Sequence, residues 1–265
     1  MQRLITLTTD FGIHDHFVGT MKGVITNINP AAQIIDISNS VNSFDVLDGA
    51  LAISHAFSYF PAETVHMVIV DPGVGTSRRP ILVTTDRHIL LAPDNGVLSL
   101  VYDKTERLSV RHITAEHYFL QPISNTFHGR DIFAAVAGWL SKGVEVAKFG
   151  EEITDFVRFA APKPKAVSAT QLRGVVLKSD KFGNLVTNFT VAEVPQLFED
   201  PTPAFKMIIN GKEITRIVTA YAQGEVGEIF GIVGSMGFVE ISMHRAASNR
   251  TLQADRGSVV EIVFE

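Results

Sequence analysis

In residues 4 to 160, short β-type runs alternate with stretches whose apolar residues recur at helical spacing. The strand-like runs are Leu4–Thr8, Gln33–Ile37 and Val65–Val70, and the last is a continuous apolar run typical of a strand buried on both faces. The helix-like stretches run from Asp15, the predicted N-cap, to Ile28 and from about Asp45 to Tyr59. This order predicts an α/β domain with a central, mostly parallel sheet.

Two further elements and a break follow in the sequence. Ile81–Thr85 and His88–Ala92, on either side of a two-residue turn, predict a hairpin added to the sheet. A last helix is expected from about Asp131 to Lys142. The chain then runs through 160–165 (AAPKPK), where two prolines and two lysines between periodic segments predict a linker.

Beyond the linker the pattern changes to many short β-type runs. They lie at Gly174–Leu177, Phe205–Ile209, Glu228–Val233, Phe238–Ser242 and Val259–Phe264. Asn210-Gly211 is a strong hairpin-turn signal, and a short helical piece is expected at about Val191–Phe198. We therefore expect two domains, an α/β domain at 1–161 and an all-β, barrel-like domain at 166–265.

Composition excludes several classes of protein. The 265-residue chain has no cysteine, which excludes a disulfide scaffold, a thiolate zinc site and a cysteine nucleophile. A net charge of −5, with both signs scattered, argues against a surface for nucleic acid. No apolar run approaches the roughly 18 residues of a membrane span, and the first residues do not resemble a signal peptide. We expect a cytoplasmic protein without nucleic-acid or membrane partners.

Polar residues follow the predicted strands of the first domain. Asp10 follows the first strand, Asp71 the buried strand and Asp94 the second strand of the hairpin, while His128 precedes the last helix. Ligands of open α/β sheets bind at these carboxyl ends. Each position also has a structural interpretation, Asp10 and Asp94 as turn residues and His128 as a packed histidine. Asp71 and Arg78 in one tight loop favour a functional site, because buried charges must pair.

His14 and His16, with Asp10 and Asp15 nearby, form a candidate metal cluster. Alternating residues share a face only on a strand, and these lie at the transition from a loop to a helix, so the pattern disfavours a metal site. The Asp71–Arg79 loop lacks the glycine spacing of phosphate-binding and dinucleotide-binding loops. We expect neither a metal nor an organic cofactor.

Two turns of the second domain have both a structural and a binding interpretation. Residues 180–188 (DKFGNLVTN) place a carboxylate and two amides around a Phe-Gly turn, which is also the composition of a hairpin with Asx turns. Residues 234–238 (GSMGF) form a small polar turn before a strand, and such a turn can offer backbone groups to a ligand.

Taken together, seven motifs occur in one order along the chain. They are TTDFG at 8–12, FVGTMKGV at 17–24, DPGVGT at 71–76, RR at 78–79, PDNG at 93–96, TFHGRD at 126–131 and DKFGNLVTN at 180–188. This series resembles the S-adenosyl-L-methionine hydroxide adenosyltransferases, relatives of the fluorinases and chlorinases that make 5′-halo-5′-deoxyadenosine. The resemblance extends from Leu4 to about Gly257.

The resemblance implies a homotrimer with an α/β domain and a β-barrel in each subunit, and active sites between the N-terminal domain of one subunit and the C-terminal domain of its neighbour. It implies attack of water or hydroxide on ribose C5′ of S-adenosyl-L-methionine, giving adenosine and methionine. The family's catalytic triad falls on Asp71, Arg78 and His128. The matching substrate-binding positions are Asp10 for the ribose diol, Phe44 beside the ribose and methionine, Asp180 and Ser235 for methionine, and Asn184 and Tyr221 for adenine.

The chemistry of these roles is coherent. A sulfonium is a good leaving group, so the enzyme has to place one water in line with the C–S bond and take its proton. A carboxylate can accept that proton, whereas an arginine stays protonated. We expect Asp71 to orient or deprotonate the water, Arg78 to be its electrostatic partner and His128 to be a second hydrogen-bond partner or proton relay. The spacing leaves open which member takes the proton.

A halogenase and a non-catalytic protein that binds adenosine or S-adenosyl-L-methionine are the alternatives. Halogenases resemble this chain but carry Tyr and Thr where it has Asp71 and Val74, and a carboxylate at position 71 would repel a halide. They also carry Tyr-Ser or Tyr-Gly at His128-Gly129. The sequence departs from the family at Met236 and at 243–248, and both departures bear on how adenine and methionine are recognised.

Overall fold

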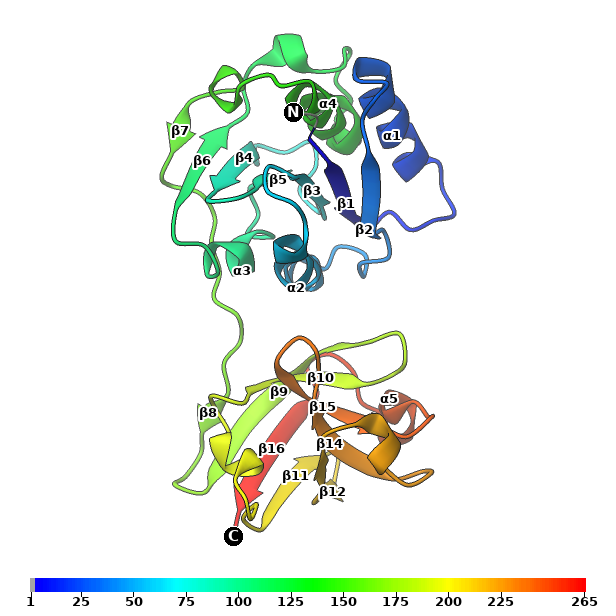
Figure 1. Cartoon of the computed structure of the whole chain (residues 1–265), viewed down its shortest axis with the longest axis vertical. Coiled ribbons are helices and arrows are strands. Elements are labelled where there is room, and N and C mark those ends of the chain that lie inside the picture. Colours follow the sequence, from blue (N-terminus) through cyan, green and yellow to red (C-terminus); the bar gives the residue numbers. More distant parts are fainter. Residues whose placement is uncertain (1–2) are drawn as a thin grey trace. The chain divides into compact units, whose positions relative to one another are not determined.

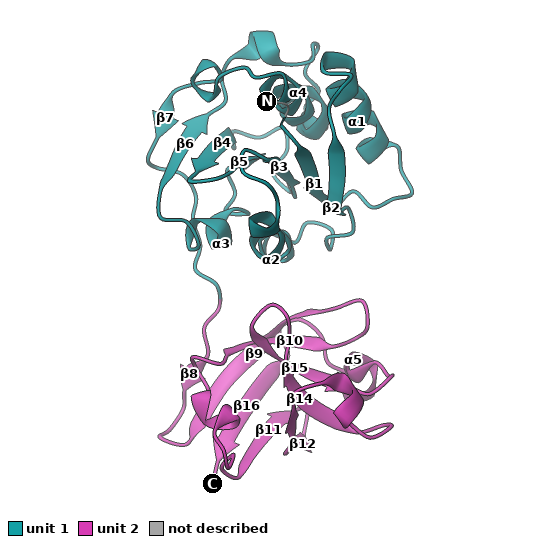
Figure 2. Ribbon diagram, viewed as in Figure 1, with its two compact units in different colours: residues 1–161 teal, residues 162–265 magenta. Residues whose placement is uncertain are grey.

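The computed structural model describes residues 3–265, so Met1 and Gln2, the first residues of the predicted α/β domain, lie outside the described residues. The chain divides into two compact units, Met1–Ala161 and Pro162–Glu265 (Figure 2). Within the described part, no helix has the length and apolar character needed to cross a membrane.

The first unit is built on a seven-stranded sheet in the order β2-β1-β3-β5-β4-β6-β7 (Figure 1). The strands are β1 (Ile5–Thr9), β2 (Ile34–Ser38), β3 (Val65–Ile69), β4 (Pro80–Thr85), β5 (Ile89–Pro93), β6 (Leu108–His112) and β7 (Glu152–Ile153). Strands β2, β1, β3 and β5 run parallel, whereas the β5–β4, β4–β6 and β6–β7 pairs are antiparallel. The sheet is therefore mixed rather than mostly parallel, because the predicted β4–β5 hairpin continues into two more antiparallel strands.

Helices cover both faces of this sheet (Figure 1). They are α1 (Phe17–Ile28), α2 (Val46–Ala56), α3 (Ser99–Tyr102), α4 (Ala135–Ser141), a π-helix (Gly129–Ala134) and 3-10 turns at Phe57–Tyr59, Glu116–Tyr118 and Val146–Lys148. One apolar core joins Leu7 of the sheet to Met21 and Phe133, and the other joins Val68 to Ile53. All five residues of β3 are buried, as its continuous apolar run predicts.

Two helix starts differ from the sequence prediction. Helix α1 is preceded by His16 rather than Asp15, and no side chain caps it. The predicted helix from Asp131 to Lys142 begins two residues earlier, as the π-helix that follows His128 and continues into α4. By contrast, Asp45 caps α2 as expected, since its side chain accepts a hydrogen bond from the backbone of Asp48.

The second unit is a nine-stranded sheet curled into a half-barrel (Figure 1). Its strands are β8 (Lys165–Ala166), β9 (Gln171–Ser179), β10 (Leu185–Thr190), β11 (Phe205–Ile209), β12 (Lys212–Ile214), β13 (Ile217–Val218), β14 (Ile229–Val233), β15 (Phe238–Met243) and β16 (Val259–Phe264). Asn210-Gly211 joins β11 to β12 as its turn chemistry predicts. Helix α5 (Ser248–Leu252) and a 3-10 turn at Tyr221–Gln223 complete the unit. The helical piece expected at Val191–Phe198 is shorter, a 3-10 turn at Pro195–Phe198.

Candidate functional site

Two carboxylates lie at the same edge of the first sheet because of strand register. Strands β1 and β3 are parallel neighbours, with Thr9 paired to Ile69, and Asp10 and Asp71 come just after them. Burial raises the pKa of the Asp10 carboxyl, and the negative charge of Asp71 raises it further, against the backbone hydrogen bonds that lower it. The charge of Asp71 therefore acts on the Asp10 carboxyl.

Asp71, Arg78 and His128 form one hydrogen-bonded cluster. Arg78 Nε donates to Asp71 Oδ1 over 3.0 Å, and Arg78 Nη2 donates to Asp71 Oδ2. The same Nη2 lies 2.9 Å from His128 Nδ1. The side chains of Arg78 and Asp71 are only 9% and 6% exposed, so the ion pair lies out of bulk water. The structure thus brings His128 to an ion pair whose arginine lies 50 residues earlier in the sequence.

The contact with Arg78 fixes the tautomer of His128. A guanidinium has donors and no acceptor, so Nδ1 of His128 must be the acceptor and carry no hydrogen. Burial lowers the pKa of His128, and the positive charge of Arg78 lowers it further, although Asp71 and Asp131 act in the opposite direction. His128 is therefore neutral near pH 7 and carries its proton on Nε2.

Loop conformation holds Arg78 against Asp71. The loop turns back on itself where the backbone of Val74 donates to the carbonyl of Asp71 over 3.2 Å. Gly75 has a φ of +76°, and a Cβ there would overlap the carbonyl oxygen of Asn125, so only glycine fits. The guanidinium of Arg78 also lies 5.6 Å from the ring centroid of Phe133. These contacts leave the arginine little freedom.

Asp10 has a second neighbour in Phe44. The backbone N–H of Phe44 donates to Asp10 Oδ2 over 2.8 Å, and Phe44 has a φ of +64°. Its side chain is 72% exposed. The exposed aromatic side chain of a residue whose backbone holds the Asp10 carboxylate is available to contact a ligand.

Asp94 has a structural role. The sequence was compatible with either a turn residue or a site residue at this position. Its carboxylate accepts from Arg79 Nη2 over 2.7 Å and from the backbone of Val157 over 2.7 Å. The neighbouring Asn95 donates to the carbonyl of Val70 over 2.8 Å. Asp94 is 6% exposed, so its charge serves to anchor residues 155–157 on the sheet.

The candidate metal cluster is not assembled. His14 and His16 are exposed, and they precede α1 in a loop. Across residues 3–265, no three histidine, aspartate or glutamate side chains are grouped so that they could hold a metal ion.

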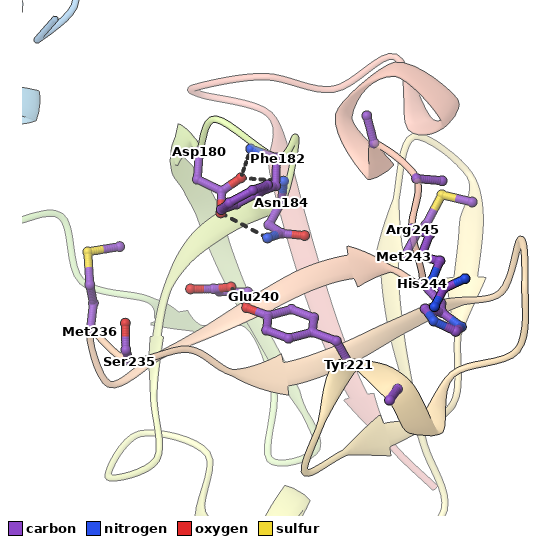
Figure 3. A pocket seen from close by; sticks show the side chains of 13 residues that line it. Asp180, Phe182, Asn184, Tyr221, Ser235, Met236, Glu240, Met243, His244 and Arg245 are labelled. Carbon is purple, nitrogen blue, oxygen red and sulfur yellow. Dashed lines mark hydrogen bonds between the residues drawn. The ribbon is translucent and has the colours of Figure 1, made fainter.

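The second unit contains a cavity of about 940 Å³. The four substrate-binding residues predicted in this part of the chain, Asp180, Asn184, Tyr221 and Ser235, all line it (Figure 3). Other lining residues are Phe182, Ala222, Met236, Glu240, Met243, His244, Arg245, Ala246 and Ala247. The structure thus places the sequence-predicted residues in two groups, one in each unit.

The Asp180 turn is held by its own carboxylate. Asp180 Oδ1 accepts from the backbone N–H groups of Phe182 and Asn184, and Oδ2 accepts from Asn184 Nδ2, each over 2.8 Å. This is the Asx-type turn that the sequence allowed, and it also forms a wall of the cavity (Figure 3). Phe182 projects from it with 77% of its surface exposed.

Glu240, on β15, is a cavity residue that the sequence analysis missed. Its Oε2 accepts a hydrogen bond from the Tyr221 hydroxyl over 3.0 Å. Burial and the neighbouring Glu240 raise the pKa of Tyr221 to about 12. The signal was present, because Glu240 is the one charged residue in an otherwise apolar and small-residue strand, 238–243 (FVEISM).

Comparisons with known proteins give a consistent picture. Family models described as the S-adenosyl-L-methionine hydroxide adenosyltransferase N-terminal and C-terminal domains match residues 5–150 and 174–261. The chain is 34% identical to the (R)-S-adenosyl-L-methionine hydrolase of Methanocaldococcus jannaschii, over 98% of this chain and 96% of that protein. It is 24% identical to a fluorinase of Actinoplanes sp., over 92% and 91%. A crystal structure of an uncharacterized conserved protein from Thermotoga maritima matches with a TM-score of 0.90 and 34% identity, over 98% and 100%.

Proposed function

The chain belongs to the S-adenosyl-L-methionine hydroxide adenosyltransferase family, and on that premise we propose that the Asp71–Arg78–His128 cluster makes it an S-adenosyl-L-methionine hydrolase. The family and the enzyme class predicted from the sequence are confirmed by the two family models and by the hydrolase relatives. The reaction produces adenosine and L-methionine. Fluorinases are more distant relatives.

The single observation that supports the catalytic assignment is the hydrogen-bonded cluster itself. Arg78 cannot accept a proton, and His128 already uses Nδ1 to accept from Arg78. His128 Nε2–H is then a donor that orients the attacking water. Asp71 remains as the proton acceptor, because a carboxylate offers about four lone-pair sites and Arg78 occupies two of them.

The proposed step is a displacement at ribose C5′ by water. The water oxygen forms a bond to C5′ while the C5′–S bond breaks, and the bonding pair leaves with the sulfur of methionine. The water proton passes to Asp71 and then to solvent. Arg78 stabilises the Asp71 carboxylate and keeps His128 in the required tautomer. A general base of this kind contributes typically about 10²- to 10⁴-fold to the rate.

Substrate binding divides between the two groups of residues. Asp10 accepts from the two ribose hydroxyls, and Phe44 packs beside the ribose and the methionine chain. In the second unit, Asp180 and Ser235 bind the methionine end, while Asn184 and Tyr221 contact adenine. The shared cavity of the last four residues supports this part of the proposal.

The two groups are proposed to meet in an oligomer. We infer a homotrimer in which the first unit of one subunit and the second unit of its neighbour complete each site, as the family resemblance implies. Neither group holds all the proposed substrate contacts alone, which supports the idea. The cytoplasmic location and the independence of metals and organic cofactors stay predictions from the sequence.

The test of the function uses the purified full chain. Incubation with S-adenosyl-L-methionine, followed by chromatography, is expected to give adenosine and methionine in equal amounts, and Asp71→Asn is expected to suppress both. Product formation at an unchanged rate in the variant would overturn the assignment of Asp71. Formation of 5′-chloro-5′-deoxyadenosine in high chloride would favour a halogenase, and binding without turnover would favour a non-catalytic binding protein.

A further inference from the structure

Glu240 is a buried carboxylate in the cavity wall for which the proposed function has no role. The residue is 5% exposed and belongs to β15, which lies between β10 and β14 in the sheet of the second unit. Figure 3 shows its carboxylate between the Asp180 turn and the Tyr221 ring. The Tyr221 hydroxyl donates to its Oε2 over 3.0 Å.

The chain makes room for this carboxylate. Gly234 lies so close to Glu240 Oε1 that a Cβ at position 234 would overlap it. Glycine at 234 therefore lets the carboxylate lie close to the backbone at the start of the 234–238 turn. The position of the charge is set by both a hydrogen bond and the shape of the backbone.

The other carboxylate of the cavity has less capacity for a ligand. Asp180 already accepts three hydrogen bonds from its own turn. For Glu240, by contrast, the hydrogen bond found within residues 3–265 is the one that it accepts from the Tyr221 hydroxyl. Since a carboxylate offers about four lone-pair sites, Glu240 has more sites left for a donor that enters the cavity.

The electrostatic surroundings favour a cationic donor. Burial raises the pKa of the Glu240 carboxyl, and the charge of Asp180 adds to this, although the Tyr221 hydrogen bond lowers it. Lys178 lies two strands away, across Val186, and His244 and Arg245 line the cavity at a distance from the carboxylates in Figure 3. A buried carboxylate needs a paired cation to be stable in its charged form.

We propose that Glu240 determines the specificity of this cavity by accepting a hydrogen bond from the ammonium group of a nucleoside that carries an amino acid. The inference rests on the proposed function, since S-adenosyl-L-methionine presents such an ammonium group. It assigns to Glu240 the discrimination between that nucleoside and one lacking the amino-acid end.

The experiment compares two nucleosides on the full chain by calorimetry. S-adenosyl-L-homocysteine carries the ammonium group and has no sulfonium to hydrolyse, whereas 5′-methylthioadenosine lacks the amino-acid end. Glu240→Gln keeps the shape and an acceptor for Tyr221 but removes the charge. This variant is expected to weaken the binding of S-adenosyl-L-homocysteine by roughly 10- to 100-fold. The binding of 5′-methylthioadenosine is expected to weaken by less than about twofold. The matched control Glu213→Gln, on β12 outside the cavity, is expected to change neither.

Kinetics provide a second readout. For S-adenosyl-L-methionine, Glu240→Gln is expected to raise KM by a similar factor while kcat stays within about threefold, because the interaction is present before the reaction begins. Equal weakening of both nucleosides, or of neither, would overturn the inference. A loss confined to S-adenosyl-L-methionine would overturn it too, because the sulfonium would then be the group recognised.

If Glu240→Gln fails to fold, the variant Asp180→Asn decides the matter, because Glu240 is then the one ionisable carboxylate among the described residues that line the cavity. The affinity of Asp180→Asn for S-adenosyl-L-homocysteine should increase with pH between about 4 and 7, as carboxylates ionise, while its affinity for 5′-methylthioadenosine stays level. A level profile for both contradicts the inference. Failure of the proposed function would appear separately, as the absence of adenosine from S-adenosyl-L-methionine.

Discussion

Nη2 of Arg78 lies 2.9 Å from Nδ1 of His128, and this contact decides which nitrogen of the imidazole carries the proton. Because Nη2 of Arg78 also donates to Asp71, one guanidinium joins a carboxylate to a neutral histidine. The proposed proton acceptor, Asp71, and the proposed hydrogen-bond donor to the water, His128, are thereby held on either side of a group that takes no part in proton transfer.

Replacing Arg78 by lysine should reduce kcat by about 10²-fold or more. A lysine ammonium cannot reproduce the planar fork that bonds Asp71 and His128 together. Steady-state kinetics measure the loss. The matched control is Arg79→Lys, one residue along, where the arginine ties Asp94 and Asp155 instead. That variant should lower the melting temperature and reduce kcat much less than Arg78→Lys does. A larger loss of kcat in Arg79→Lys than in Arg78→Lys would contradict the two assignments.

Replacing Gly75 by alanine should lower both stability and kcat. The new Cβ would overlap the carbonyl oxygen of Asn125, so the loop that carries Arg78 must move. Gly143→Ala is the control, because Gly143 also has a positive φ, +96°, but faces open space. It should cost only about 1 kcal/mol of stability and leave kcat unchanged. Denaturant titration and kinetics compare the two, and equal effects on kcat would count against the role of the loop.

The pH dependence of kcat should show an acid limb that lies below the ordinary range of histidine. The active form requires a neutral His128, and burial together with Arg78 lowers the pKa of this group. Protonation of His128 therefore sets in only below about pH 6.5. The rate should be level on the acid side down to that pH and fall beneath it. An acid limb centred above pH 7 would contradict the neutral-histidine account.

Stability should fall with acid because of a buried histidine pair in the first unit. His66 and His88 are 0% and 3% exposed, with ring centroids 5.0 Å apart, and His66 Nδ1 lies 2.7 Å from the Thr6 hydroxyl. Burial lowers the pKa of His66 to about 3, and burial also lowers that of His88. In the unfolded chain both histidines bind a proton as the pH falls through about 6.5, whereas in the folded chain they do so only at lower pH. Their contribution to the free energy of unfolding is therefore fully present above about pH 6.5 and is lost as the pH falls below it.

The measurement is the free energy of unfolding between pH 4 and 7. Each histidine contributes a slope of up to about 1.4 kcal/mol per pH unit. The double variant His66→Leu/His88→Leu should show a shallower slope, whatever its absolute stability. His14→Leu, at an exposed histidine, should leave the slope unchanged. An unchanged slope in the double variant would contradict this origin of acid sensitivity.

The elements that could be predicted from the sequence are those with strong local signals. The apolar run of β3, the Asp45 cap of α2 and the Asn210-Gly211 turn depend on a few neighbouring residues, and each appears in the structure. The mixed direction of the first sheet could not be predicted, because the pairing of β6 with β4 depends on contacts distant in sequence. Register is a tertiary property that local pattern does not contain.

The candidate site divides in the same way. Asp71 and Arg78 could be paired from one short loop, but the contact of His128 with Arg78 spans 50 residues and required the fold. Glu240 was missed because the strand pattern around it reads as apolar, and the resemblance to the family assigned it no role. Asp94 shows the opposite case, since a polar residue at a strand end is a structural anchor.

The most direct test of the central claim is hydrolysis of S-adenosyl-L-methionine in water enriched in oxygen-18, with mass spectrometry of the adenosine formed. Attack of water on C5′ with cleavage of the C5′–S bond predicts one heavy oxygen, at the 5′ hydroxyl, in each adenosine molecule, and none in the methionine. Asp71→Asn should slow the appearance of this label without changing its position. Adenosine free of the label, or a label on another product, would contradict the mechanism.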